Sequence, residues 1–272
     1  MKIIYTTDLH GNQSYYDQLA EVAQMAEADI VINGGDMLPK GGDMFTQGEF
    51  ITGHLDKHMQ EITAKGINYI CALGNDDLII FDEIFETICR KYPLVTNIAQ
   101  RKVEIKGIEF VGMNWVVDYP FRLKDRCRMD TKDYIFQQQL GSGLLSTPAG
   151  WEEIPDWPSY VATLPTLEDE LKALPRPNNM QDSIYIIHMP PYGIGLDECR
   201  AGKHIVGSRA LAKFIADNQP LYTLHGHIHE SPQVSGKWQS PIGNTTCIQP
   251  GQGPKFTYVT IDTKSGALHR LQ

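Results

Sequence analysis

Seven side chains suited to binding metal ions follow directly after hydrophobic runs, in five short motifs. These motifs are TTDLHG, NGGD, LGND, IIHMPP and HGHIH. A mixture of imidazole, carboxylate and amide ligands suits a pair of divalent transition metals. Two such ions that share one carboxylate can polarise a phosphoryl oxygen and activate a water molecule. The candidate ligands are Asp8, His10, Asp36, Asn75, His188, His227 and His229.

The first three motifs lie in a part of the chain where predicted strands and helices alternate. Short apolar, β-branched runs predict buried strands, and apolar residues at helical spacing predict helices. This alternation predicts a largely parallel sheet, in which ligands bind beyond the carboxyl ends of the strands. All three early motifs lie at such ends. The predicted strands span 2–7, 29–33 and 67–73, and the predicted helices span 13–28, 47–65 and 78–90.

After residue 101 the pattern changes to one that predicts a second, mixed sheet. We expect the two sheets to pack face to face between helices, as a four-layer α/β sandwich (αββα). The motifs run through most of the chain, so we expect a single domain over residues 1–272. The expected elements are a hairpin of strands 103–105 and 108–113 around Lys106-Gly107, strands at 184–187 and 221–224, a helix capped by Ser208 and running to about 217, and strands within 233–271.

Residues 118–182 interrupt this rhythm and are expected to form an insertion. They are rich in proline, contain Trp151, Trp157 and Tyr160, and predict one helix near 166–174. A connection of this length between two core strands is often a lid or a binding loop, and we expect it to shape the substrate pocket. The alternative is a surface insertion without a role. Its basic residues either steer phosphate or, as we favour, form a solvated face; they are Arg122, Lys124, Arg126 and Arg128.

The composition limits the possible partners and surroundings. The formal net charge is −9, from 24 basic and 33 acidic residues, and this makes a nucleic acid polymer an unlikely partner. Five scattered cysteines without a C-x-x-C pattern indicate a reducing compartment. The sequence has neither a signal-like apolar segment at the start nor an apolar run long enough to span a membrane. We therefore expect a cytoplasmic protein without a membrane partner, and its oligomeric state is left open.

The motifs in the order D-x-H, G-D, G-N, H and G-H-x-H resemble the signature of the calcineurin-like metallophosphoesterase superfamily. This resemblance covers about residues 3–230. It implies two divalent metal ions (Mn, Fe, Zn or Ni) and attack on phosphorus by a metal-bridging hydroxide. It also implies a catalytic role for His188. In the implied arrangement Asp36 bridges the ions, one of which is bound by Asp8, His10 and His229 and the other by Asn75, His188 and His227.

Two positions depart from relatives of this superfamily. Many relatives have a histidine after the asparagine of the G-N motif, and it is credited with protonating the leaving group; here Asp76 follows Asn75. A protonated Asp76 would act as the acid, whereas an ionised Asp76 would orient a metal-bound histidine. Pro39 stands where purple acid phosphatases have an iron-binding tyrosine. A ferric centre is therefore not expected. The absence of a histidine after Asn75 puts efficient hydrolysis of monoesters with poor leaving groups in doubt.

Further candidates lie near the later motifs. Asn75 is also expected to contact substrate, and Tyr192 is expected at the rim of the pocket. His204 and Ser208 precede a predicted helix, whose first N–H groups could bind an anion; the alternative, which we favour for Ser208, is a plain helix cap. His54 and His58 are four residues apart on a predicted helix and are expected to lie on its solvated face.

These observations together predict a dinuclear-metal phosphoesterase that acts on a small phosphodiester. The alternatives within the superfamily are a nuclease or DNA-repair exonuclease and a phosphomonoesterase. A non-catalytic scaffold is less favoured, because all seven ligand positions are filled.

Overall fold

The first of two six-stranded sheets combines the N-terminal strands with the last two strands of the chain. This computed structural model describes residues 1–200 and 206–272. β1 to β4 run parallel to one another, while β15 pairs antiparallel with β1 and β16 pairs antiparallel with β15. The order is β16-β15-β1-β2-β3-β4. The bounds are β1 Lys2–Thr6, β2 Ile30–Asn33, β3 Asn68–Cys71, β4 Val95–Asn97, β15 Tyr258–Asp262 and β16 Ala267–Leu271.

The second six-stranded sheet is also mixed, with the order β13-β14-β12-β11-β6-β5. Its four central strands are parallel and its two edge strands are antiparallel to their neighbours. The predicted hairpin is confirmed, because Lys106 and Gly107 form its turn with φ of 52° and 80°. The bounds are β5 Lys102–Ile105, β6 Ile108–Met113, β11 Ile184–Ile187, β12 Tyr222–Leu224, β13 Gln239–Ile242 and β14 Thr245–Ile248.

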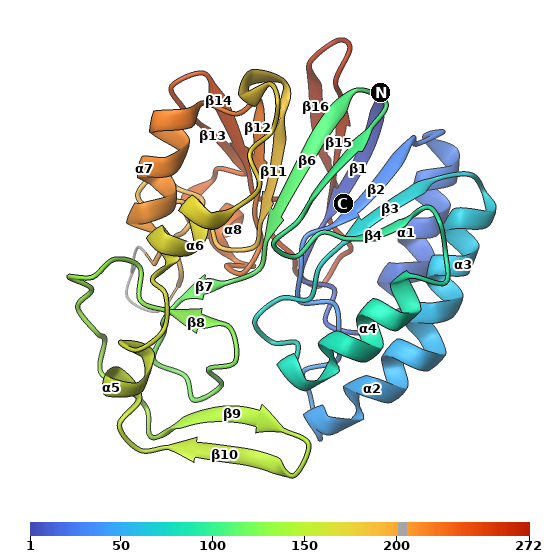
Figure 1. Cartoon of the computed structure of the whole chain (residues 1–272). Coiled ribbons are helices and arrows are strands. Elements are labelled where there is room, and N and C mark those ends of the chain that lie inside the picture. Colours follow the sequence, from blue (N-terminus) through green and yellow to red (C-terminus); the bar gives the residue numbers. More distant parts are fainter. Residues whose placement is uncertain (201–205) are drawn as a thin grey trace.

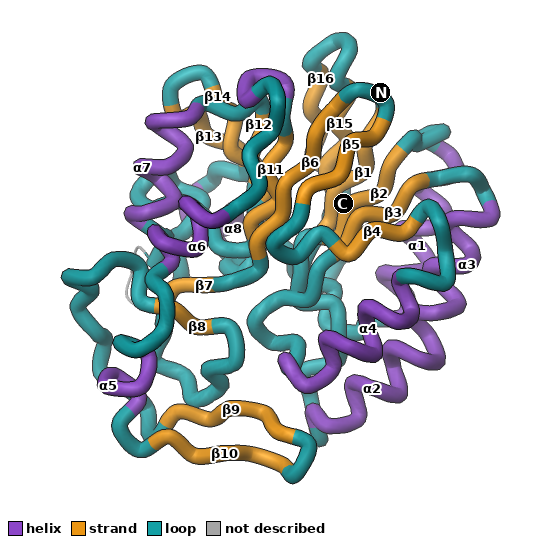
Figure 2. Tube along the Cα trace, in the orientation of Figure 1, coloured by secondary structure: helices purple, strands orange, loops and turns teal. Residues whose placement is uncertain are grey.

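Helices cover the outer face of each sheet (Figures 1 and 2). Helices α1 to α4 pack on the first sheet, and α6 and α7 pack on the second. The helices are α1 Gln13–Met25, α2 Gln47–Phe50, α3 Asp56–Ala64, α4 Asp82–Cys89, α5 Trp157–Val161, α6 Leu167–Ala173, α7 Arg209–Asn218 and α8 Ser231–Ser235. Short turns of other helix types are η1 Met44–Thr46, η2 Ile51–Leu55, η3 Ile79–Phe81 and η4 Met180–Asp182.

Three hydrophobic clusters account for this layering. The middle cluster joins the facing sides of the two sheets, where Ile3, Ile32, Phe110 and Ile186 are buried together. The two outer clusters join each sheet to its own helices. The predicted four-layer α/β sandwich is therefore confirmed, and burial of apolar side chains on both faces of each sheet stabilises it.

The prediction of a solvated face for His54 and His58 is wrong for His58. The predicted helix at 47–65 is observed as α2, η2 and α3 in succession. His58 is buried, and its ring packs edge-on against Tyr16 and Tyr69. Burial, with repulsion from His54 and Lys65, lowers the pKa of His58 to about 3. Helical spacing alone does not show which side of a helix faces the sheet.

The segment 118–182 contains more regular structure than the sequence predicts. Besides α5 and the predicted α6, it forms a hairpin of β9 Gly143–Thr147 and β10 Gly150–Ile154. Its first part also forms a separate two-stranded sheet with the residues that precede the segment, because β8 Cys127–Arg128 lies parallel to β7 Val116–Val117. In Figure 1 this hairpin lies at the bottom of the view, and its turn lies near the start of α2.

Three of the four basic residues at 122–128 are not part of the solvated face that we expected, whereas Arg122 is exposed. Lys124, Arg126 and Arg128 are buried, and their partners are Asp118, Asp82 and Glu170. Arg122 is exposed and pairs with Glu153. Because their charges are matched within the fold, these residues do not form a basic surface.

Four of the cysteines, Cys71, Cys89, Cys127 and Cys247, are buried. Within the described ranges, every helix is too short or too polar to cross a membrane.

Candidate metal centre

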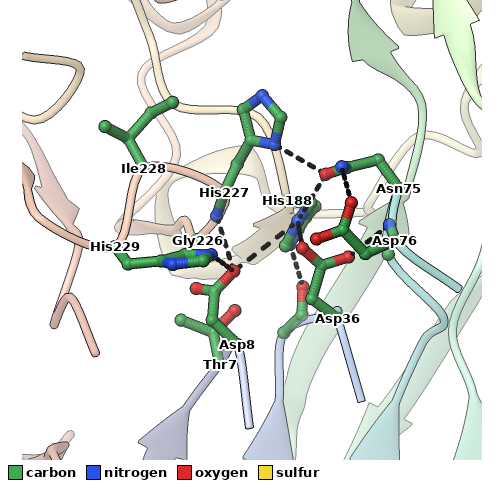
Figure 3. A network of polar contacts seen from close by, with 12 residues as sticks. Thr7, Asp8, Asp36, Asn75, Asp76, His188, Gly226, His227, Ile228 and His229 are labelled. Atoms are coloured by element: carbon green, nitrogen blue, oxygen red, sulfur yellow. Dashed lines mark hydrogen bonds and ion pairs between the residues drawn. The ribbon is translucent and has the colours of Figure 1, made fainter. Parts of the chain in front are cut away.

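All seven predicted ligands come together at the edge where the parallel strands of both sheets end. Asp8 and His10 follow β1, Asp36 follows β2 and Asn75 follows β3. His188 follows β11 of the second sheet, and His227 and His229 follow β12. Figure 3 shows ligands from both sheets pointing toward one another. The carboxyl ends of parallel strands are the expected place for a ligand site in this kind of sheet.

Four of these ligands have a backbone conformation that side chains rarely adopt. The φ angles are 59° at Asp8, 44° at His10, 50° at Asp36 and 69° at His227. Such conformations cost on the order of 1–3 kcal/mol each and persist only where the surroundings hold them. Here the loops after β1 and β2 hold each other, since Asp8 N–H donates to the Gly35 carbonyl and His10 N–H to that of Asp36, both at 2.9 Å.

Glycines allow the loops to approach the ligands closely. A Cβ atom at Gly74 would lie 2.3 Å from the Asp36 backbone nitrogen, and one at Gly226 would lie 2.7 Å from Asp8 Oδ2. Real Cβ atoms essentially never come this close. Any side chain at either position would therefore displace a candidate ligand, which explains why both motifs contain glycine.

One group of ligands is formed by Asp8, His10, Asp36 and His229, whose ligand atoms all lie within 4.8 Å of one another. The Nε2 atoms of His10 and His229 are 3.0 Å apart, and Asp8 Oδ1 is 3.5 Å from His229 Nε2. Asp8 Oδ2 and His10 Nδ1 are buried without a hydrogen-bond partner among the described residues. A buried carboxylate oxygen without a donor is rare, and a bound cation would satisfy it.

A second group is formed by Asn75, His188 and His227. Asn75 Oδ1 lies 2.6 Å from His227 Nδ1 and 3.1 Å from His188 Nε2. His188 Nδ1 is 3.0 Å from the Gly34 carbonyl, which fixes the ring with Nε2 toward the centre. Asp36 Oδ2 lies between the two groups, 3.4 Å from His188 Nε2 and 3.9 Å from His10 Nε2. The donor set therefore fits two cations that share Asp36.

The electrostatics of the site keep two of its imidazoles, those of His10 and His227, neutral. Burial is the main cause that lowers the pKa of His10 to about 4 and that of His227 to about 3. Burial also acts against a charge on His188, but attraction to Asp36 and Asp8 outweighs it and raises its pKa to about 9. The same attraction outweighs burial at Asp36 and holds the pKa of its carboxyl well below the usual range. A negative pocket beside neutral imidazoles suits a divalent cation.

Asp76 lies in the wall of the site, but it contacts an amide and not a metal-binding histidine. Its Oδ1 accepts a hydrogen bond from Asn75 Nδ2 at 3.1 Å, which turns the other amide atom, Oδ1, toward the centre. The closest histidine nitrogen, His10 Nδ1, is 3.9 Å from Asp76 Oδ2. Burial and the charge of Asp36 raise the pKa of Asp76 to about 6, against the opposing effect of Lys40.

Two functional candidates were missed from the sequence. Lys40 lies at the mouth of the site, with Nζ 3.1 Å from His10 Nε2 and 3.6 Å from Asp76 Oδ2. Asp77 accepts hydrogen bonds from the backbone N–H groups of Met37, Leu38 and Gly74 at 2.7–2.9 Å. The signal for Lys40 was a basic residue four positions after the aspartate of the G-D motif, whereas no pattern distinguished Asp77 from Asp76.

The structure does not bring Ser208 or Tyr192 to the centre. Ser208 is the N-cap of α7, and its hydroxyl donates to Asp130, whose other carboxylate oxygen accepts from the N–H groups of Arg209 and Ala210. The start of this helix is therefore already occupied by a carboxylate of the protein, as the plain-cap alternative requires. Tyr192 stacks with Arg209 and is not part of the cavity wall at the centre. His204 lies outside the described residues.

A cavity of about 830 Å³ opens beside the candidate ligands. Asp36, Asn75, His227 and His229 form one part of its wall, and Lys40 and Asp76 adjoin them. Another part of the wall comes from the beginning of the segment 118–182. A cavity of this size holds a small organic ligand.

The fold and this site define a class of protein, a two-sheet α/β sandwich with a candidate metal centre at the shared edge of its sheets. The model of one family, calcineurin-like phosphoesterase, matches residues 1–231. The chain therefore belongs to the calcineurin-like phosphoesterase family, as the motifs predicted. Members of this family are metal-dependent hydrolases of phosphate esters.

Solved structures with low sequence identity share the fold. TT1561 of Thermus thermophilus is 16% identical with a TM-score of 0.59, and the match covers 99% of this chain and 97% of that one. A dimetal phosphatase from Danio rerio is 11% identical with a TM-score of 0.51, with coverages of 96% and 91%. GAP50, the anchor in the inner membrane complex of Plasmodium, is 10% identical with a TM-score of 0.51, with coverages of 100% and 88%. No curated protein sequence matches the chain.

Proposed function

We propose that this protein hydrolyses a small phosphodiester with the help of two divalent metal ions. Asp8, His10 and His229 would hold one ion, and Asn75, His188 and His227 the other, with Asp36 shared between them. The observation that carries this proposal is the convergence of ligands from both sheets around buried polar atoms that have no partner of their own. Mn²⁺, Fe²⁺, Zn²⁺ and Ni²⁺ all suit such a donor set.

The metal ions would supply a water of lowered pKa and positive charge on the phosphoryl oxygens. Within this chain, Asp8 and Asp36 supply the two carboxylates of the ligand set, so two divalent ions would leave a positive surplus. Lys40 lies next to the site, and its positive charge offsets that of an ionised Asp76, whose Oδ2 is 3.6 Å from Lys40 Nζ. The histidine ligands do not cancel this surplus, because an imidazole ligand carries no negative charge. The site would therefore attract a phosphate ester.

The preference for a diester rests on Asp76. An acid that protonates a leaving group must hold its proton at the working pH, and a carboxyl with a pKa of about 6 is mostly ionised at neutral pH. Lys40 also favours the ionised form. We infer that Asp76 mainly orients Asn75, and that the protein acts on diesters whose leaving group needs little protonation. A long nucleic acid is disfavoured, because the basic residues at 124–128 are buried in ion pairs.

Hydrolysis by the metal-loaded protein tests this proposal. The protein, reconstituted with each of the four metals, is assayed on bis-p-nitrophenyl phosphate, p-nitrophenyl phosphate and single-stranded DNA. We expect the diester to be cleaved with the highest kcat/KM. His229→Ala should abolish most of the activity without unfolding the protein, because this side chain is 28% exposed. Activity on the monoester alone would refute the diester preference, and full activity of His229→Ala would refute the ligand assignment.

A further inference from the structure

The cavity beside the metal centre has one strongly apolar wall. Tyr119, Pro120, Phe121 and Leu123 line it from the start of the segment 118–182, and Met189 and Ile228 line it from the loops of the second sheet. Ile228 stands between two candidate ligands in the sequence, so apolar surface begins directly beside the metal centre. Inorganic phosphate alone would leave most of a cavity of about 830 Å³ without contacts.

Three rings form a row from the centre to the rim of this cavity. The ring of Tyr119 lies 5.8 Å from that of the candidate ligand His227 and 5.9 Å from that of Phe121, centroid to centroid. Phe121 is 64% exposed, which is unusual for such a large apolar side chain. Its exposed face continues the wall that Tyr119 begins. We call Tyr119 and Phe121 the aromatic strip.

The aromatic strip is held in place by buried polar contacts. Lys124 and Asp118 form an ion pair of 2.7 Å in which both side chains are fully buried. Asp118 also accepts from Trp157 Nε1 at 2.8 Å, and Lys124 donates to the carbonyl of Tyr119. The next residue is fixed as well, because the Pro120 carbonyl accepts from the Leu140 N–H at 2.9 Å. A wall fixed in this way loses little conformational entropy when a ligand packs on it.

From this arrangement we infer that the substrate is a phosphate ester with an aromatic group close to the phosphate, and that Tyr119 and Phe121 select for this group. The inference rests on the proposed function, since it assumes that the phosphate binds at the metal centre. Planar rings pack on exposed aromatic side chains in offset or edge-on geometry, and this packing contributes more binding free energy than the burial of apolar surface alone. The ring could be a phenol-like aryl group or a nucleobase, because both present the same flat apolar face.

Binding of phosphonates, which cannot be hydrolysed, tests the aromatic strip separately from catalysis. Phenylphosphonate and methylphosphonate are titrated into the Mn²⁺-loaded protein by calorimetry. We expect phenylphosphonate to bind at least about tenfold more tightly, which corresponds to about 1.4 kcal/mol. Thymidine 5′-monophosphate compared with ribose 5-phosphate forms the nucleobase arm; both are monoesters, so release of inorganic phosphate is measured alongside to show that they stay intact during the titration. A preference in one arm alone identifies which kind of ring the strip selects.

Variants show whether the strip causes the preference. Phe121→Ala and Tyr119→Leu should each reduce the ratio of the two phosphonate affinities to about threefold or less. Ile135→Ala is the matched control, because Ile135 belongs to the same segment and is 87% exposed but does not line the cavity. Its ratio should equal that of the unaltered protein. Phe121 is exposed enough for its truncation to leave the fold intact.

The possible failures are distinguishable. Three results would overturn the inference. The two compounds of each matched pair could bind equally, or neither phenylphosphonate nor thymidine 5′-monophosphate could bind. The preference could also survive when Phe121→Ala and Tyr119→Leu are combined. A clear preference for the ring without cleavage of bis-p-nitrophenyl phosphate would support the aromatic strip and refute the proposed diesterase activity. Cleavage of the diester with equal affinities within both matched pairs would do the reverse.

Discussion

Asp77 ties together the two loops that carry Asp36 and Asn75, and replacing it with asparagine tests this role. Its Oδ2 accepts from the N–H groups of Met37 at 2.9 Å and Gly74 at 2.7 Å, and its Oδ1 accepts from that of Leu38 at 2.8 Å. All these contacts are buried. An asparagine has the same shape but only one acceptor oxygen, so it cannot satisfy three donors on both sides.

The size of the effect follows from this geometry. The best placement of the amide puts its oxygen where Oδ2 receives two donors, so that its NH₂ group faces the N–H of Leu38. Loss of one hydrogen bond to a charged group costs about 1.5–3 kcal/mol, and the two that remain lose their charge assistance. Burial and the charge of Asp36 raise the pKa of Asp77 to about 8, so the comparison is made at about pH 9, where Asp77 is mostly ionised and accepts all three bonds. Relief of the repulsion from Asp36 offsets part of the loss. We expect Asp77→Asn to lower the free energy of unfolding by about 3 kcal/mol.

The measurement is urea and thermal unfolding of Asp77→Asn, with Asp76→Asn as the matched control. In a chain of this length about 3 kcal/mol corresponds to a fall in Tm of roughly 6 °C or more. Asp76 is 27% exposed and its side chain accepts no backbone donor, so Asp76→Asn should cost under about 1 kcal/mol. If Asp77→Asn were as stable as Asp76→Asn, the three backbone hydrogen bonds would not need a carboxylate and the reasoning would be refuted.

Three further predictions concern acid stability, a buried ion pair and the metal ions. Below pH about 6.5 the unfolded chain protonates His58 but the folded protein does not, because its pKa is about 3. Between about pH 7.5 and pH 5 the protein should therefore lose about 2 kcal/mol more stability than His58→Phe, and equal losses in urea unfolding would contradict this. Lys124→Met leaves Asp118 buried without its cation and should lower the free energy of unfolding by about 3–5 kcal/mol. In a double-mutant cycle, the added change Asp118→Asn should restore part of this loss. A loss below about 1 kcal/mol would contradict the pairing. Mn²⁺ at about a hundred times its Kd should stabilise the protein by about 2.7 kcal/mol, and chelation should remove this gain. His229→Ala should gain less stability at the same Mn²⁺ concentration. An equal gain would show that the ion binds elsewhere.

The ligands could be predicted from the sequence because strand ends are a local signal. Each motif stands directly after an apolar run, and parallel strands end at one edge, so the sequence predicts convergence without any distances. The layering was predictable for the same reason, since alternation of strands and helices is periodic along the chain. The bounds of β11 agree with the sequence prediction, and α7 begins after the predicted cap Ser208 and ends one residue beyond the predicted end.

Other features depend on contacts that a sequence pattern does not contain. His58 and Lys124 look like surface residues by type, yet each is buried by elements far away in the sequence. Ser208 offered an anion site by pattern, but Asp130, 78 residues away in sequence, already occupies the start of that helix. Asp76 and Asp77 differ only in the direction that each side chain takes from a tight turn. Such facts follow from tertiary packing, which local propensity does not determine.

The division of the ligands between the sheets has a consequence for how the site forms. The first sheet supplies Asp8, His10, Asp36 and Asn75, and the second supplies His188, His227 and His229. Each proposed group of ligands contains members from both sheets, so neither sheet alone completes a site for either ion. The cluster of apolar side chains between the sheets therefore holds in place the two sets of loops that carry the ligands. A protein organised in this way places its chemistry where the packing of two independent sheets is most constrained, and this accounts for the presence of glycine wherever one loop crosses another at the centre.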